Sequence, residues 1–135
     1  MNLNNEKEIE TKLHNFFARE DKTKLAFLIG SYAKRAARPE SDVDVAVLFG
    51  RSFDIKQVFE LKERLTQLLG KDVDLVVLDS AGPVMKMQAL KTGILLYAER
   101  GAYEQFFVST INEYDDLKYC RREIEENILR RRLYA

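Results

Sequence analysis

The order of apolar and polar residues along the chain predicts an alternation of helices and short strands. Apolar residues at spacings of three and four predict amphipathic helices, whereas short apolar runs, or apolar residues that alternate with polar ones, predict strands. By these criteria the sequence predicts helices over residues 5–19, 54–70, 83–93 and about 102–133, and strands over 24–29, 42–49, 72–78 and 94–97.

This alternation predicts an α/β (α+β) fold in which helices flank a small mixed β-sheet. A chain of 135 residues is suited to one compact domain, and no repeat, low-complexity tract or Gly/Pro/Ser-rich linker divides it. We therefore expect a single domain over residues 1–135. Its core is expected at about 25–97, and a helical extension at about 102–133.

The predicted C-terminal helix is long for a domain of this size. If unbroken it measures about 45 Å, whereas a compact domain of this length is about 37 Å across. Its apolar residues form one stripe, so an overhanging end needs a partner to cover it. The stripe consists of Tyr103, Phe107, Ile111, Tyr114, Leu117, Ile124 and Ile128.

Acidic residues on two predicted strands give the first indication of a metal-binding site. Asp42 and Asp44 alternate with valines, so their Cα atoms are expected roughly 6.5–7 Å apart on the open face of a strand whose other face is packed. Such carboxylates can hold Mg²⁺, which prefers oxygen ligands. Asp74, or with less support Asp72, can add a third carboxylate from a neighbouring strand.

A glycine turn precedes these acids. Gly30 and Ser31 directly follow the apolar strand 24–29, where a small residue lets backbone N–H groups approach a phosphate and the serine hydroxyl adds a hydrogen bond. Taken alone, the turn is most simply structural and the acids are most simply solvated. Their combination at this spacing instead favours transfer of a phosphoryl or nucleotidyl group.

Composition argues against several kinds of partner and site. Lys plus Arg and Asp plus Glu both number 22, so no overall charge attracts the chain to nucleic acid, and no direct nucleic-acid partner is expected. One cysteine and one histidine exclude an internal disulfide and a zinc site rich in these residues. No apolar run is long enough for a membrane span, so the expected location is the cytoplasm.

The motif also carries a family resemblance. Gly30-Ser31, ten intervening residues and Asp42-Val43-Asp44, with Arg38-Pro39-Glu40-Ser41 just before the first aspartate, resemble the signature of the DNA polymerase β-like nucleotidyltransferases. The short length and the Val73-Asp74-Leu75-Val76 strand resemble the minimal nucleotidyltransferase (MNT) branch, the antitoxins of HEPN–MNT toxin–antitoxin pairs. The resemblance covers about residues 25–97 and extends more weakly to the C-terminus.

The resemblance implies a function and a set of site residues. It implies a nucleotidyltransferase fold and an antitoxin that uses ATP and Mg²⁺ to transfer AMP to a tyrosine hydroxyl of a partner HEPN ribonuclease, which silences the toxin. Gly30 and Ser31 would bind the nucleotide. Asp42, Asp44 and Asp74 would be the catalytic acids that bind the metal.

One departure and two alternatives accompany this interpretation. Many relatives have a second glycine where this chain has Arg35, which either adds phosphate contacts or reshapes the loop. One alternative function is a binding antitoxin that acts by contact, without catalysis. The other is a small-molecule nucleotidyltransferase of the aminoglycoside-modifying type, which generally has a further acceptor domain for which this chain leaves no residues.

Overall fold

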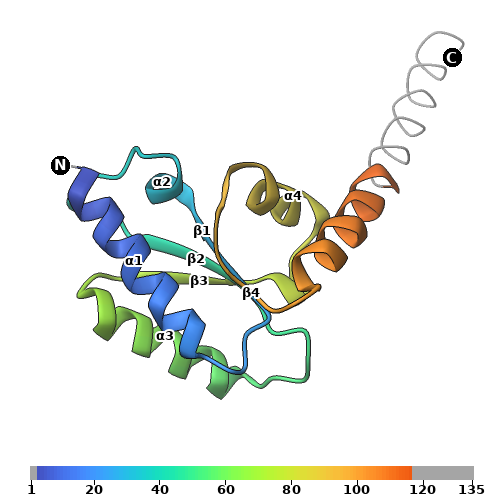
Figure 1. Cartoon of the computed structure of the whole chain (residues 1–135), viewed down its shortest axis with the longest axis horizontal. Helices are drawn as coiled ribbons and strands as arrows, with labels where there is room; N and C mark the ends of the chain where they lie inside the picture. The colour runs from blue at the N-terminus through green and yellow to red at the C-terminus, as the bar shows by residue number, and fades with distance from the viewer. Residues whose placement is uncertain (1–2, 117–135) are drawn as a thin grey trace, which may run out of the picture.

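The computed structural model describes residues 3–116 of the chain and contains four strands surrounded by helices (Figure 1). Its helices are α1 (Leu3–Arg19), the four-residue α2 (Gly30–Ala33), α3 (Ile55–Leu69) and α4 (Pro83–Thr92), with a C-terminal helix described over 102–116. Its strands are β1 (Leu25–Ile29), β2 (Val43–Leu48), β3 (Val73–Val77) and β4 (Ile94–Ala98), and a 3-10 turn, η1 (Leu78–Ser80), follows β3.

The predicted elements are confirmed, with described boundaries that differ by no more than two residues. Residues 117–133 of the predicted C-terminal extension lie outside the described residues. The sequence did not predict α2, which occupies the turn that begins at Gly30. Such a short helix has no room for a repeating apolar pattern, so periodicity cannot reveal it.

Local signals account for the sharp ends of α3. The backbone N–H of Gln57 donates to the Asp54 side chain, and the Asp54 N–H donates back to the Gln57 side chain, both at 2.9 Å. This capping box satisfies two N–H groups that the first turn leaves without helical partners. Gly70 ends the helix in the left-handed conformation, at φ 66°.

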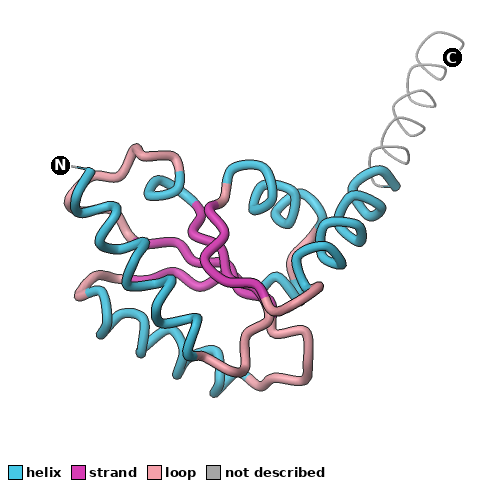
Figure 2. The backbone as a smooth tube through the Cα atoms, in the orientation of Figure 1, coloured by secondary structure: helices cyan, strands magenta, loops and turns pink. Residues whose placement is uncertain are grey.

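The sheet has the order β3-β2-β1-β4 and is mixed, as predicted. The central strand β1 is antiparallel to β2 and β4, whereas β2 and β3 are parallel. Figure 2 shows the strands crossing the middle of the molecule, with α1 and α3 together on one side. Leu13 and Phe17 of α1 and Leu65 of α3 pack there in one core with the valines of β2.

The face of β2 that carries Asp44 was expected to be open, and this prediction is wrong over most of the strand, since Ala46 is buried. Phe27 and Ala46 lie opposite each other on β1 and β2 and belong to a second core. Ala89 of α4 and Phe106 of the C-terminal helix complete that core. β1 is apolar on both faces, so both of its faces must be covered.

The packed side of the C-terminal helix coincides only in part with the predicted stripe, of which Tyr103 packs against the second core. Ala102, Phe106 and Thr110 are buried, whereas Phe107 of the stripe is 45% exposed and its neighbour Val108 is 58% exposed. The described part extends away from the sheet beyond α4 (Figure 1). None of the described helices combines the length and apolar character needed to cross a bilayer.

Candidate functional site

The predicted glycine turn lies directly against the predicted acidic strand. Ile29, the last residue of β1, pairs with Asp44 of β2, and Gly30 follows at φ 73°. A Cβ at Gly30 would lie 3.1 Å from Cγ and 3.2 Å from Cβ of Asp44 and would overlap a carboxylate oxygen. Only glycine permits both this backbone conformation and this contact.

A second carboxylate lies beside Asp44. Asp44 and Asp74 occupy paired positions in the parallel ladder between β2 and β3. Burial raises the pKa of Asp44, the negative charges of Asp74 and then Asp42 raise it further, and a side-chain hydrogen bond with Asp74 acts in the same direction. The structure therefore brings Asp44 and Asp74 together and places Asp42, exposed just before β2, within electrostatic range.

The donor set fits a divalent cation with oxygen ligands. Within residues 3–116, no three acidic, histidine or cysteine side chains are already gathered as a complete metal site. Mg²⁺, however, usually takes one or two carboxylates together with water and substrate phosphates. Like-charged acids that raise the pKa of Asp44 are relieved when a cation binds between them. The residues present therefore fit Mg²⁺ bound together with a nucleotide.

A cleft of about 340 Å³ opens beside these groups, a size within the usual range for ligand sites. Gly30 and Asp44 lie at its polar end, where Lys34 is the one cationic lining residue. Its apolar part comes from β1, β3 and α4, with Ile29, Val76, Met85 and Ala89 as lining residues, joined by Gln88 and Thr92. The arrangement offers a charged end for phosphates and an apolar wall for a base.

Not every predicted residue lines this cleft. Ser31 lies in the first turn of α2, half-buried and next to Gly30, outside the cleft lining. Asp72 is exposed before β3, and its carbonyl oxygen accepts a hydrogen bond from the Val43 N–H at 3.0 Å. Lys34 was missed from the sequence, although its place in the basic run 34–38 after the turn was a usable signal.

Arg35, where many relatives have glycine, keeps a glycine-like backbone. Its φ is 58°, a left-handed conformation that costs a side-chain-bearing residue about 1–2 kcal/mol. Its guanidinium pairs with Glu10 of α1 at 3.2 Å and with Glu6 at 4.0 Å. Arg35 therefore lies on the α1 side of the turn and outside the lining of the Gly30 cleft.

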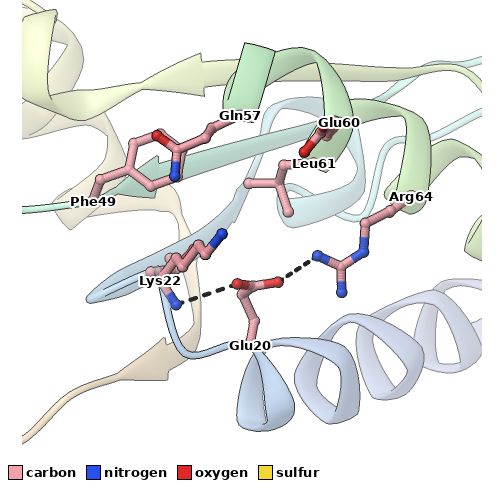
Figure 3. Close-up of a pocket in the computed structure, with 8 residues that line it drawn as sticks. Glu20, Lys22, Phe49, Gln57, Glu60, Leu61 and Arg64 are labelled. Carbon is pink, nitrogen blue, oxygen red and sulfur yellow. Dashed lines mark hydrogen bonds and ion pairs between the residues drawn. The ribbon is translucent and has the colours of Figure 1, made fainter. Parts of the chain in front are cut away.

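A second cavity, between the end of α1 and α3, is unrelated to this site (Figure 3). It measures about 40 Å³, too small for a nucleotide. Glu20 accepts hydrogen bonds there from Arg64 at 2.7 Å and from the Lys22 N–H at 3.2 Å. None of the predicted site residues lines it, so we interpret it as a structural ion-pair network.

Comparisons with known proteins identify relatives of this chain. Residues 11–101 match the model of the polymerase β nucleotidyltransferase family. The protein adenylyltransferase MntA of Shewanella oneidensis is 35% identical over 108 residues, which cover 80% of this chain and 78% of that protein.

Solved toxin–antitoxin structures also align with this chain over most of its length. A toxin–antitoxin structure with AMP-PNP aligns with a TM-score of 0.73 at 33% identity and covers 89% of this chain and 98% of the matched chain. The complex of tri-AMPylated Shewanella oneidensis HEPN toxin with MNT antitoxin aligns with a TM-score of 0.69 at 31% identity, over 92% and 98% of the two chains.

Proposed function

Because this chain belongs to the polymerase β nucleotidyltransferase family, we propose that it is an antitoxin that transfers AMP from ATP to a tyrosine hydroxyl of a partner HEPN ribonuclease toxin and thereby neutralises it. The observation that carries the proposal is the contact between the Gly30 turn and Asp44, with Asp74 paired beside it. We also propose a cytoplasmic location, where ATP and such a partner meet.

The residues have distinct roles in this proposal. Gly30 and Ser31 bind the triphosphate through the backbone and hydroxyl of the turn. Lys34, at the same end of the cleft, neutralises phosphate charge. Asp42, Asp44 and Asp74 would hold Mg²⁺, which when bound supplies the remaining charge neutralisation on the phosphates.

The reaction forms one bond and breaks one. The tyrosine oxygen forms a bond to the α-phosphorus, the bond from that phosphorus to the bridging oxygen breaks, and pyrophosphate leaves with the bonding electrons. The phenolic proton passes to water or to a carboxylate. Asp74 is exposed, whereas Asp44 is partly buried against Gly30, so a bulky acceptor approaches from the Asp74 side.

The decisive experiment is a mass measurement. The full chain is incubated with MgATP and the HEPN protein encoded beside it, and the intact mass of that protein is recorded. The proposal predicts an increase by one or more AMP units, lost with Asp44→Asn and retained with Asp21→Asn, an exposed acid outside the site. An unchanged partner mass with the unmodified chain would refute the proposal, and transfer to a small hydroxylated acceptor would support the aminoglycoside-type alternative.

Neutralisation by contact is a second candidate, favoured by one observation. Phe107 and Val108 on the C-terminal helix are 45% and 58% exposed, and apolar residues so placed suit a protein partner. The Asp44→Asn variant separates the two functions in cells that express the toxin. Growth rescued by this variant at normal expression supports contact, whereas loss of rescue supports catalysis.

A further inference from the structure

Lys34 and Arg35, adjacent at the end of α2, line two different cavities. Lys34 lines the Gly30 cleft, whereas Arg35 lines a groove of about 370 Å³ between α1 and β4, together with Lys7, His14 and Leu95. One basic residue is thus available to a ligand in the cleft. The other faces α1 across the groove, with 40% of its side chain exposed.

The backbone at Arg35 closes the turn that carries Gly30. The N–H of Lys34 donates to the Gly30 carbonyl at 3.1 Å, and the N–H of Ala36 donates to the Ser31 carbonyl at 2.9 Å. Arg35 lies between these bonds in the left-handed conformation that commonly ends a helix. Because a Cβ disfavours this conformation, other contacts must hold it in place.

The contacts come from α1. Glu6 and Glu10 lie one turn apart on this helix, and the Arg35 guanidinium reaches both, at 4.0 and 3.2 Å. The Glu6 side chain is only 8% exposed, and a carboxylate this buried requires a cationic partner. These three residues, which we call the Arg35 clamp, attach the end of the turn to a helix that the core already fixes.

We propose that Arg35 is a positioning residue: the Arg35 clamp holds residues 30–34 in the conformation that binds the nucleotide triphosphate, without touching the nucleotide itself. This inference rests on the proposed function, since it assigns a role within the same site. A preformed turn spares the ordering that a loose turn would require on binding, so the clamp acts on nucleotide affinity. It has no role in the bond-making step.

The test substitutes each partner of the Arg35–Glu10 ion pair in turn. Arg35→Gly deletes the guanidinium while relieving the backbone, and Glu10→Gln leaves the backbone untouched. Each is expected to raise the Kd and the KM for MgATP about 2- to 5-fold, with kcat and the KM for the partner unchanged. The double variant is expected to bind MgATP no more weakly than the single variant with the higher Kd, because both substitutions remove the same interaction. Arg35→Lys is expected to recover part of the affinity.

Glu8→Gln is the matched control. Glu8 lies on the same helix and pairs only locally with Lys12 among the described residues, so this variant should bind MgATP as the unmodified chain does. MgATP binding that is unchanged in both clamp variants overturns the clamp and leaves the proposed function intact. The clamp is equally overturned if only melting temperature changes, or if Glu8→Gln weakens binding to the same extent. An unmodified chain that fails to bind MgATP overturns the proposed function and the clamp together.

Discussion

Gly30 packs against the carboxylate of Asp44 so closely that no β-carbon fits between them. One residue supplies the turn that approaches phosphate, and the other is the most buried acid of the predicted set. Because they touch, any side chain added at Gly30 would displace the Asp44 carboxylate.

Gly30→Ala is expected to abolish AMP transfer and to lower the free energy of unfolding. Gly70→Ala is the matched control, because Gly70 has a similar φ of 66° but open space around its Cα. The left-handed conformation costs either alanine about 1–2 kcal/mol. Only Gly30→Ala adds the collision with Asp44. Urea unfolding should therefore show the larger loss for Gly30→Ala, and equal losses with equal activity would contradict the contact.

Asp44→Asn is expected to stabilise the metal-free protein while it removes transfer. Like charges on paired strand positions cost up to about 1 kcal/mol, which corresponds to a rise in Tm of roughly 2–5 °C. Thermal unfolding in the presence of a chelator measures the change, with Asp21→Asn as the control. An unchanged or lower Tm would indicate that the acids do not repel one another in the folded chain.

The same repulsion gives this stabilisation a pH dependence. The folded pKa of Asp44 lies above its ordinary value of 3.8 because of burial, Asp74 and Asp42, so protonation favours the folded state. The contribution of Asp44 to stability is full below 3.8 and is lost as pH rises through the raised pKa. The advantage of Asp44→Asn in chelator should therefore grow as pH rises above 3.8 and level off above the raised pKa. A constant advantage would contradict the shift.

Lys34→Ala is expected to weaken MgATP binding with a smaller effect on the partner. A charged hydrogen bond contributes about 1.5–3 kcal/mol, so KM for MgATP should rise about 10- to 100-fold. Lys62→Ala, on the exposed face of α3, is the control. A KM unchanged in Lys34→Ala would show that the cation at the cleft does not meet the phosphates.

Tyr32→Phe is expected to leave stability unchanged or to raise it by up to about 1 kcal/mol. The Tyr32 ring is fully buried, and its hydroxyl has no hydrogen-bond partner in the part of the chain that the structure describes. Removing an unsatisfied polar group spares its desolvation cost. Urea unfolding tests this with Tyr97→Phe, a partly exposed tyrosine, as reference. A loss above about 1 kcal/mol in Tyr32→Phe would reveal a partner for the hydroxyl.

Sequence patterns predicted the elements because their signals are local. Asp54 and Gly70 mark the ends of α3 within the helix itself, and the alternation around Asp44 identifies its strand. The cover over Ala46 depends on Phe106, sixty residues away, and the pattern of β2 contains no information about it. The conformation of Arg35 likewise depends on Glu10, on a helix formed by a distant segment.

In the candidate site, too, some residues have local sequence signals, whereas others depend on contacts between distant segments. The spacing of Gly30, Asp44 and Asp74 predicted residues that the structure places in contact or on paired positions. The α4 side of the cleft required knowing how α4 crosses the sheet. Lys34, in contrast, had a local signal in the basic run 34–38 after the turn. Asp42 was expected on the same strand as Asp44, and β2 begins one residue later, at Val43. Asp42 therefore lies exposed just before the strand, where its charge still raises the pKa of Asp44.

The second core has a practical consequence for anyone who wishes to shorten this protein. The rings of Phe27 and Phe106 lie 6.0 Å apart, so part of the lining of the central strand comes from beyond residue 97. A fragment trimmed to the predicted core at 25–97 would expose Phe27 to water and would also lose α1 from the other face. Such a fragment would be prone to aggregate, and a minimal soluble version should retain both flanking helices.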